Sequence, residues 1–454
     1  MKYISTRGTI KPIDFCDAVM MGLATDGGLI LPESIPDCKD RLAEFSCLSY
    51  QELCFEIMKL YISDIPDDEL KALVDKSYAT FDHPDIAPLL KTSSCYILEM
   101  FHGPTLAFKD LALQFLGNLF EHILQGSDKQ LNILAATSGD TGSAAIHGVR
   151  GKDKIKIFVL HPYKKVSPLQ EKQMTTVLDD NVFNIAINGT FDDAQRIIKE
   201  TFADIDFKTK HHLGAVNSVN WARVLAQIVY YFYASLAVCK EENADAVNIT
   251  VPTGNFGNIF AGYLACQMGA PINKLVLATN ENDILSRFMQ SGTYALADVQ
   301  PSLSPSMDIQ VASNFERYLY YQCNQDSEKL LALMNEFKET GSITPSGDID
   351  SIFAAGAANA ADTKAIIKTV YEDDGYILDP HTAVGVHVAQ QHQTEVPMIC
   401  MATADPAKFP DAVNSAIGIE ARHPILDALK DLPSRCETLD AENQIIQSYL
   451  TSNL

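Results

Sequence analysis

The spacing of apolar residues along the chain changes near residue 90. Up to that point apolar residues recur at every third or fourth position, which predicts helices. The predicted helices are Ile13–Leu23, Tyr50–Ser63 and Asp67–Tyr78. A turn and a short extended piece, Asp26-Gly27-Gly28-Leu29-Ile30-Leu31-Pro32, separate the first two helices. We therefore expect residues 1–90 to form a mostly helical N-terminal segment.

From Tyr96 onward, short continuous apolar runs alternate with helical segments. The runs fit strands that are buried on both faces; they are Leu131–Ala136, Ile155–Leu160, Val182–Ile187, Ala246–Val251, Lys274–Thr279 and Met398–Ala402. Helical spacing follows most of them, as in Ser167–Val177, Phe191–Phe202 and Trp221–Cys239. This alternation predicts an α/β fold with largely parallel sheets.

We expect two α/β domains after the N-terminal segment, residues 91–215 and 216–454. The polar segment Lys208–Gly214 is a plausible boundary between them. The region from about residue 300 to 360 contains many Pro and Ser residues, so we expect it to be less regular and to consist mainly of connections.

Composition limits the classes of partner. Of the 454 residues, 47% are apolar and 20% charged, as in soluble globular proteins. The net charge of −23 argues against a surface for nucleic acid or an anionic membrane. The start of the chain lacks the apolar core of a secretory signal, and the most apolar long stretch, Val224–Cys239, is too short to span a bilayer. We expect this stretch to be a buried helix and the protein to be cytoplasmic.

Cysteine and histidine positions do not indicate a metal site. The ten cysteines include no CxxC pair, which favours reduced thiols over a disulfide framework or a zinc site. The groups His211-His212 and His381, His387 and His392 lack metal-ligand spacing. We therefore expect no metal.

One lysine, Lys109, stands where a turn becomes a helix. Gly103-Pro104 indicates the turn, and Leu111 and Phe115 begin the helical spacing. A cation in the first helical turn lies at the positive end of the dipole, and apolar neighbours also disfavour its charge. Both effects lower the pKa and favour a neutral amine, which can condense with a carbonyl. Taken alone, Lys109 also fits a surface lysine whose charge stays in water.

Two loops follow predicted strands and open helices. The first, Thr137-Ser138-Gly139-Asp140-Thr141-Gly142, places small residues and hydroxyls at a helix start, where free N–H groups can bind a carboxylate. Ordinary capping by Ser138 or Thr141 explains it equally well. The second, Pro252-Thr253-Gly254-Asn255-Phe256-Gly257-Asn258, lets backbone amides surround a phosphate.

These loops do not match the common nucleotide motifs. The second loop is not GxGxxG, and Gly103 to Asp110 lacks the Gly and Ser/Thr of a Walker A motif. A lysine, a carboxylate cradle and a phosphate cradle fit pyridoxal phosphate (PLP) with an amino-acid substrate, because the cofactor carries an aldehyde and a phosphate.

Over nearly its whole length the sequence resembles the threonine synthase family, whose members are PLP enzymes of fold type II, the tryptophan-synthase-β-like class. The motifs that carry the resemblance are Ser5-Thr6-Arg7-Gly8, Asp26-Gly27-Gly28-Leu29, Phe101 to Asp110, Thr137 to Ala145, Asn188 to Asp193, Asn217 to Arg223, Pro252 to Asn258 and Thr403 to Phe409. The N-terminal helical segment distinguishes this family from the shorter dehydratases.

The resemblance implies a role for each motif. Lys109 would bind PLP as a Schiff base and Thr403 would offer its hydroxyl to the pyridine nitrogen. The residues that would hold the cofactor phosphate are Gly254, Asn255, Phe256, Gly257 and Asn258. The residues that would receive the amino-acid part of the substrate are Thr137, Ser138, Asp140, Thr141 and Gly142. Asp405 stands where many relatives are expected to have His.

The implied reaction converts O-phospho-L-homoserine and water to L-threonine and phosphate, a carbon–oxygen lyase reaction of threonine biosynthesis. Lys109 would first hold PLP and then, once substrate displaces it, remove the Cα proton as a general base. We expect a monomer or weak homo-oligomer.

The leaving phosphate needs cations. Arg223 follows Asn217 and Ser218 at the opening of a long helix, so the three could bind one anion; a structural ion pair is the alternative for Arg223. Lys164 and Lys165 are weaker candidates, which could equally be solvated surface charges.

Two other functions stay open from the sequence. A serine/threonine dehydratase would share Lys109 and the phosphate loop, but not the N-terminal segment or the Asn217–Arg223 motif. A non-catalytic PLP-binding homologue would also keep Lys109, although intact loops argue against it.

Overall fold

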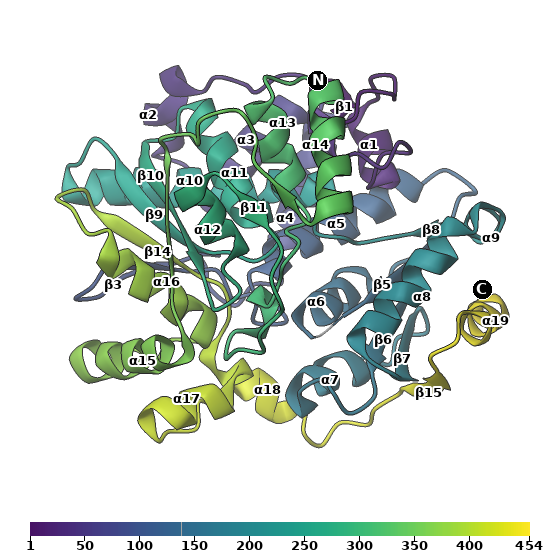
Figure 1. The fold of residues 1–454 in the computed structure, drawn as a ribbon. Coiled ribbons are helices and arrows are strands. Elements are labelled where there is room, and N and C mark those ends of the chain that lie inside the picture. Colours follow the sequence, from purple (N-terminus) through teal and green to yellow (C-terminus); the bar gives the residue numbers. More distant parts are fainter. Residues whose placement is uncertain (138) are drawn as a thin grey trace.

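A computed structural model describes residues 1–137 and 139–454 of the chain, which form two parallel-sheet layers (Figure 1). The larger sheet has the order β13-β10-β9-β14-β4-β3. Its strands are β3 (Leu89–Lys91), β4 (Tyr96–Glu99), β9 (Val247–Pro252), β10 (Ile272–Thr279), β13 (Phe353–Ala357) and β14 (Met398–Ala402). Neighbouring strands are parallel, except that β3 is antiparallel to β4.

The smaller sheet is parallel throughout and has the order β15-β7-β6-β5-β8. Its strands are β5 (Leu131–Ala136), β6 (Ile155–Pro162), β7 (Val182–Asn188), β8 (Leu213–Gly214) and β15 (Glu437–Asp440). The last helix, α19 (Asn443–Asn453), contacts β15 and α8 (Phe191–Ala203). The C-terminus therefore lies beside the smaller sheet (Figure 1).

Helices cover both faces of the larger sheet because successive strand residues point to opposite sides. In β10, Leu275 and Leu277 belong to one apolar cluster and Val276 and Ala278 to another. The first cluster includes α10 (Trp221–Glu242) and α11 (Gly257–Met268), and the second includes α16 (Pro380–Gln391). Strands buried on both sides explain the continuous apolar runs of the sequence.

The N-terminal segment is mostly helical, as expected, and packs on the core of the larger domain. Its helices are α1 (Phe15–Met21), α2 (Leu42–Phe45), α3 (Tyr50–Tyr61) and α4 (Asp67–Tyr78), preceded by β1 (Tyr3–Ser5), which pairs with β2 (Ile30–Pro32). A capping box between Ser49 and Glu52 fixes the start of α3. Contacts of α3 with α10, and of α4 with α5 (Lys109–Leu124), attach the segment to the rest of the fold.

The remaining elements connect the layers. They are α6 (Asp140–Val149), α7 (Pro168–Thr175), α9 (Ile205–Lys210), α12 (Ile284–Ser291), α13 (Phe315–Gln322), α14 (Ser327–Thr340), α15 (Ala360–Asp374), α17 (Pro410–Ile417), α18 (Pro424–Ala428), the 3-10 helices η1 (Lys39–Arg41), η2 (Pro305–Met307) and η3 (Pro406–Lys408), and the pair β11 (Tyr294–Ala295) and β12 (Ser342–Ile343).

The six predicted strands all occur, within two residues of their predicted ends. The segment Lys208–Gly214 contains β8, which pairs with β5 in the smaller sheet, and α10 of the larger layer follows it, so the boundary there stays a prediction. The region from 300 to 360 is more regular than expected, since it contains α13, α14 and β13. The helix α14 buries few side chains, among them Leu330 and Phe337, so its polar surface hid the helical pattern.

The sheets do not follow the predicted division at 90/91 and 215/216. The strand β4 and Lys109 belong to the layer of the larger sheet, and β15 returns to the smaller one. The division into domains at those residues stays a prediction.

The stretch Val224–Cys239, which was expected to be too short to span a bilayer, lies within the longer helix α10. By length and composition, the 22 residues of α10 are sufficient to cross a bilayer. However, 83% of its most apolar window is buried inside the structure, as in the core helix of a globular protein. The expectation of a buried helix is confirmed.

Candidate active site

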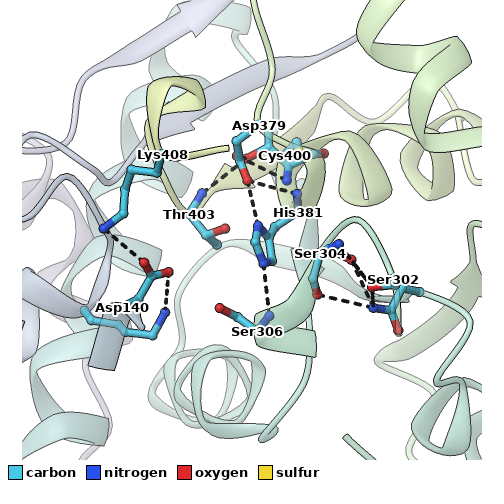
Figure 2. Close-up of polar contacts among 12 residues, drawn as sticks. Asp140, Ser302, Ser304, Ser306, Asp379, His381, Cys400, Thr403 and Lys408 are labelled. Carbon is cyan, nitrogen blue, oxygen red and sulfur yellow. Dashed lines mark hydrogen bonds and ion pairs between the residues drawn. The ribbon is translucent and has the colours of Figure 1, made fainter. Parts of the chain in front are cut away.

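The loops with the predicted site residues all follow the carboxyl ends of parallel strands. Lys109 comes after β4, Asn255 after β9, Thr403 after β14 and Asp140 after β5 of the other sheet. Ligands in such folds bind beyond these strand ends. Figure 2 shows Asp140 and Lys408 on one side of Thr403, with His381 and Ser306 on the other. The fold thus brings most of the predicted residues to one place.

Lys109 is the first residue of α5, as the sequence predicts. The segment before it pairs with the segment after β14, because Phe108 N–H donates to Thr403 O at 2.9 Å and Asp405 N–H donates to Leu106 O at 3.1 Å. These backbone bonds fix Lys109 beside Thr403.

The turn before Lys109 is held by a buried carboxylate. Asp110 accepts hydrogen bonds from Thr105 N–H and Thr105 Oγ1, both at 2.8 Å. A Cβ added to Gly103 would lie 2.4 Å from Asp110 Cβ, so glycine is required at this close approach. Burial raises the pKa of Asp110 to about 6, although the Thr105 hydrogen bonds oppose this rise.

The environment of Lys109 favours the neutral amine. Its side chain is 12% exposed, and its Nζ lies 3.3 Å from Asp140 Oδ2. Burial lowers its pKa, and the positive charges of Lys408 and Arg223 lower it further, whereas Asp140 acts in the opposite direction. The interpretation as a surface lysine was therefore wrong. Desolvation, which is one of the two effects expected from the sequence, is the main cause of the lowered pKa.

The loop after β5 is shaped by Thr137, whose side chain is buried. Its Oγ1 accepts hydrogen bonds from Gly139 N–H at 3.0 Å and Gly142 N–H at 2.9 Å. Thr141 is half-buried, and Ser138 lies outside the described residues. Substrate binding by Thr137, Ser138, Asp140, Thr141 and Gly142 stays a prediction.

Asp140 is almost completely enclosed. Besides Lys109, its carboxylate contacts Lys408 Nζ at 3.0 Å and accepts a hydrogen bond from Gln170 Nε2 at 2.9 Å. Burial alone would raise its pKa, but the charges of Lys408 and Lys109 outweigh burial and hold the pKa below its usual range. Asp140 is therefore an anion at every physiological pH.

The glycine-rich loop after β9 has the predicted order of strand, turn and helix. Phe256 takes a left-handed conformation with φ 64°, and α11 begins at Gly257, so the first-turn N–H groups of the helix have no partner within it. A Cβ on Gly254 would lie 2.9 Å from Ser306 O. Ser313 Oγ donates to Asn255 Oδ1 at 3.0 Å.

Asn258 leaves a buried donor without a partner. Its Oδ1 accepts hydrogen bonds from the hydroxyls of Tyr230, at 2.7 Å, and Tyr231, at 2.8 Å. With Oδ1 fixed, Nδ2 is buried and has no partner among the described residues. A buried donor that lacks a partner is costly, so an acceptor is expected to occupy this position. The loop fits an anionic group such as the PLP phosphate.

Arg223 lies in the first turn of α10, and its surroundings contradict the alternative of a structural ion pair. Its Nη1 donates to Val216 O at 3.2 Å, its Nε is buried without a partner, and no carboxylate of the described chain pairs with it. Burial lowers its pKa to about 10.

The other candidates for phosphate binding are more accessible. Asn217 is exposed, and Ser218 Oγ lies 2.8 Å from Ser313 Oγ, which in turn contacts Asn255. The Asn217–Arg223 motif and the glycine-rich loop are thus neighbours. Lys164 and Lys165 are both exposed, as for solvated surface charges.

Thr403 follows β14, and its backbone N–H donates to Thr382 Oγ1 at 3.3 Å. Within the described residues no hydrogen bond involves its hydroxyl, which is free to serve a ligand. Asp405 caps η3, because its side chain accepts a hydrogen bond from Ala407 N–H at 2.8 Å. Burial raises the pKa of Asp405, with Asp379 adding to the rise.

Sequence reasoning missed two groups of residues. Lys408 lies in the motif Thr403 to Phe409, yet no feature of the sequence assigned a role to its side chain, which is fully buried. Asp379, His381 and Thr382 begin α16: His381 Nδ1 lies 2.9 Å from Asp379 Oδ1, and Ser306 N–H donates to His381 Nε2 at 3.3 Å (Figure 2). The sequence signal for this group was Asp379 before Pro380, a common helix start.

Comparison with known proteins gives matches along nearly the whole chain. The family model "Threonine synthase N terminus" matches residues 2–78, "Pyridoxal-phosphate dependent enzyme" matches 80–347, and "Threonine synthase, C-terminal" matches 382–450. A threonine synthase of Schizosaccharomyces pombe is 48% identical over 92% of this chain and 89% of its own length. The chain belongs to the threonine synthase family. A threonine synthase of Pseudomonas aeruginosa is 44% identical over 100% of the chain and 98% of its own length.

Solved structures agree with this family assignment. The structure described as PLP-bound threonine synthase from Brucella melitensis is 42% identical, has a TM-score of 0.95, and covers 100% of this chain and 99% of its own. Fold type II and PLP dependence, both expected from the sequence, are confirmed. The roles of individual residues stay predictions.

Proposed function

We propose that the protein converts O-phospho-L-homoserine and water to L-threonine and inorganic phosphate. Family membership over the full length supports threonine synthase activity. The observation that carries the proposal is the position of Lys109: its buried amine faces the loop of Asp140, within the field of Arg223. A base for Cα and a cation for phosphate are what this reaction needs. The cytoplasmic location and the monomer or weak homo-oligomer remain predictions.

Residues of both layers would hold the cofactor and the substrate. Lys109 would bind the PLP aldehyde, the loop Gly254–Asn258 its phosphate, and Thr403 its ring nitrogen. When bound, PLP supplies an electron sink for the carbanion formed at Cα. The N–H groups at the start of α6 would bind the substrate carboxylate, and Asn217, Ser218 and Arg223 its phosphate.

The protein's own chemistry is then the movement of protons by Lys109. Once displaced by the substrate amine, the neutral Nζ takes the Cα proton, and Asp140 at 3.3 Å stabilises the ammonium that forms. Loss of a Cβ proton would accompany departure of the γ-phosphate, whose charge Arg223 would neutralise and which would leave as hydrogen phosphate. Water would then add its hydroxyl at Cβ, and one proton returned to Cγ and one to Cα would complete threonine. The Lys109 amine would then be free to hold the cofactor again.

The test compares two reactions of the purified protein with PLP. We expect phosphate release from O-phospho-L-homoserine, with threonine formed in equal amount, and little keto acid from threonine. Lys109→Ala should abolish phosphate release. Keto-acid formation without phosphate release would instead identify a dehydratase. A PLP adduct trapped on Lys109 by borohydride without turnover of either substrate would favour the non-catalytic alternative.

A further inference from the structure

Asp140 lies between two lysines that come from different parts of the chain. Its Oδ2 is 3.3 Å from Lys109 Nζ, and its Oδ1 is 3.0 Å from Lys408 Nζ. Figure 2 shows Lys408 reaching Asp140 from the segment that follows Thr403. One carboxylate therefore contacts the amino groups of two lysines.

The two lysines are held differently. The side chain of Lys408 is completely buried and also donates to Thr105 O at 2.6 Å, whereas that of Lys109 is 12% exposed and contacts Asp140 alone by hydrogen bond. The backbone of Lys408 is fixed in η3, which Asp405 caps. Lys408 thus joins the turn before Lys109, the loop of Asp140 and the segment after β14.

Charge balance distinguishes the two lysines further. A buried cation needs a nearby anion, and a single carboxylate cannot neutralise two cations. Other charged groups near Lys408 are Asp110, Asp405 and the half-buried His147, none of which hydrogen-bonds its ammonium in the described structure. Lys408 donates a hydrogen bond to Thr105 O and forms an ion pair with Asp140, while Lys109 has one longer contact with Asp140. Burial and the charge of Lys408 lower the pKa of Lys109, which favours loss of its proton.

We propose that Lys408 is a positioning residue, a buried partner that occupies Asp140 and so keeps the Lys109 amine ready to give up its proton. The proposal rests on the PLP-dependent reaction proposed above, because a neutral Lys109 matters for condensing with the cofactor and for removing the Cα proton. Lys408 itself touches neither the cofactor nor the substrate in this assignment.

Proton binding to Lys109 can be measured without turnover. The rate at which the apoenzyme forms a borohydride-reducible PLP adduct on Lys109, followed by peptide mass against pH from about 6 to about 10, reports the fraction of neutral amine. In Lys408→Met, Asp140 faces Lys109 alone. We expect the midpoint to rise by about one pH unit, so that adduct formation at neutral pH slows about tenfold.

A second pair of variants covers a failure of Lys408→Met to fold. Asp140→Asn and Asp140→Asn/Lys408→Met differ only in Lys408, and the double variant leaves no unpaired charge from this ion pair. The midpoint should be higher in the double variant than in Asp140→Asn, because a cation near Lys109 is removed. Lys430→Met, which removes a lysine from an exposed ion pair with Asp427, should match wild type.

An unchanged midpoint in both comparisons would overturn the proposal and leave Lys408 a purely structural lysine. A lowered Tm in Lys408→Met, with an unaltered titration of Lys109, has the same meaning. If wild type fails to release phosphate from O-phospho-L-homoserine, the proposed function fails, but a shifted midpoint in Lys408→Met still supports this role of Lys408.

Discussion

Replacing Arg223 by methionine should stabilise the fold and weaken substrate binding. Arg223 is buried without a carboxylate partner in the described chain, and burial lowers its pKa from the ordinary arginine range to about 10. A lowering of this size corresponds to about 3 kcal/mol against the charged form. Because the folded pKa lies below the unfolded one, this cost is fully present below about pH 10 and is relieved as the pH rises above that value.

Methionine keeps much of the side-chain volume and removes the charge. Loss of the hydrogen bond to Val216 O takes back about 1 kcal/mol, so the free energy of unfolding without anion should rise by about 2 kcal/mol. Two charge-assisted hydrogen bonds to the substrate phosphate would contribute at least about 3 kcal/mol. KM for O-phospho-L-homoserine should therefore rise about a hundredfold or more, with little change in PLP affinity.

Urea unfolding of the apoenzyme, with and without inorganic phosphate, measures the first effect, and initial rates of phosphate release measure the second. At about 100 times its Kd, phosphate should stabilise wild type by about 2.7 kcal/mol and the variant by much less. Arg317 is the matched control, since it is also buried but donates to Ile30 O at 3.1 and 2.9 Å and to Val219 O at 2.6 Å. Arg317→Met should lower stability. A KM unchanged in Arg223→Met would refute the reasoning.

Three further outcomes follow from the site. Gly103→Ala places a Cβ 2.4 Å from Asp110 Cβ and should cost about 1–3 kcal/mol in urea unfolding, while it slows adduct formation at the neighbouring lysine. Asn258→Ala should weaken PLP binding at least about tenfold in equilibrium dialysis, whereas Tyr230→Phe, which keeps the Asn258 amide, should change it little. Burial raises the folded pKa of Asp110, so wild type should lose up to about 3 kcal/mol of stability as the pH rises from about 4 to about 6. Asp110→Asn should not show this loss, and equal pH profiles of stability in the two proteins would contradict the reasoning.

Residues near Lys109 in the sequence could be predicted because their signals are local. A turn, an apolar helix and a glycine-rich loop after a strand are each readable within about ten residues. The role of Lys408 could not be found this way. It lies in Ala407-Lys408-Phe409, which resembles a surface turn, and its acceptor Thr105 is 303 positions earlier.

The same limit applies to the fold. The strands at the centres of the sheets are continuous apolar runs, so their positions were predicted correctly. The strand β15 reads Glu437-Thr438-Leu439-Asp440 and is mostly exposed, which gives no strand signal. Its return to the smaller sheet, beside β7, is a tertiary pairing that local pattern cannot specify.

The pairing of β15 with β7 determines when the smaller sheet can be completed during translation. The edge of β7 is covered by residues 437–440, so it stays open while the ribosome adds nearly all of the chain after Asn188. An open edge with unpaired N–H and C=O groups can recruit a strand from another chain. Nascent chains arrested before residue 437 should therefore associate with one another more readily than chains that include residues 437–440, because these residues protect the smaller sheet from misassembly.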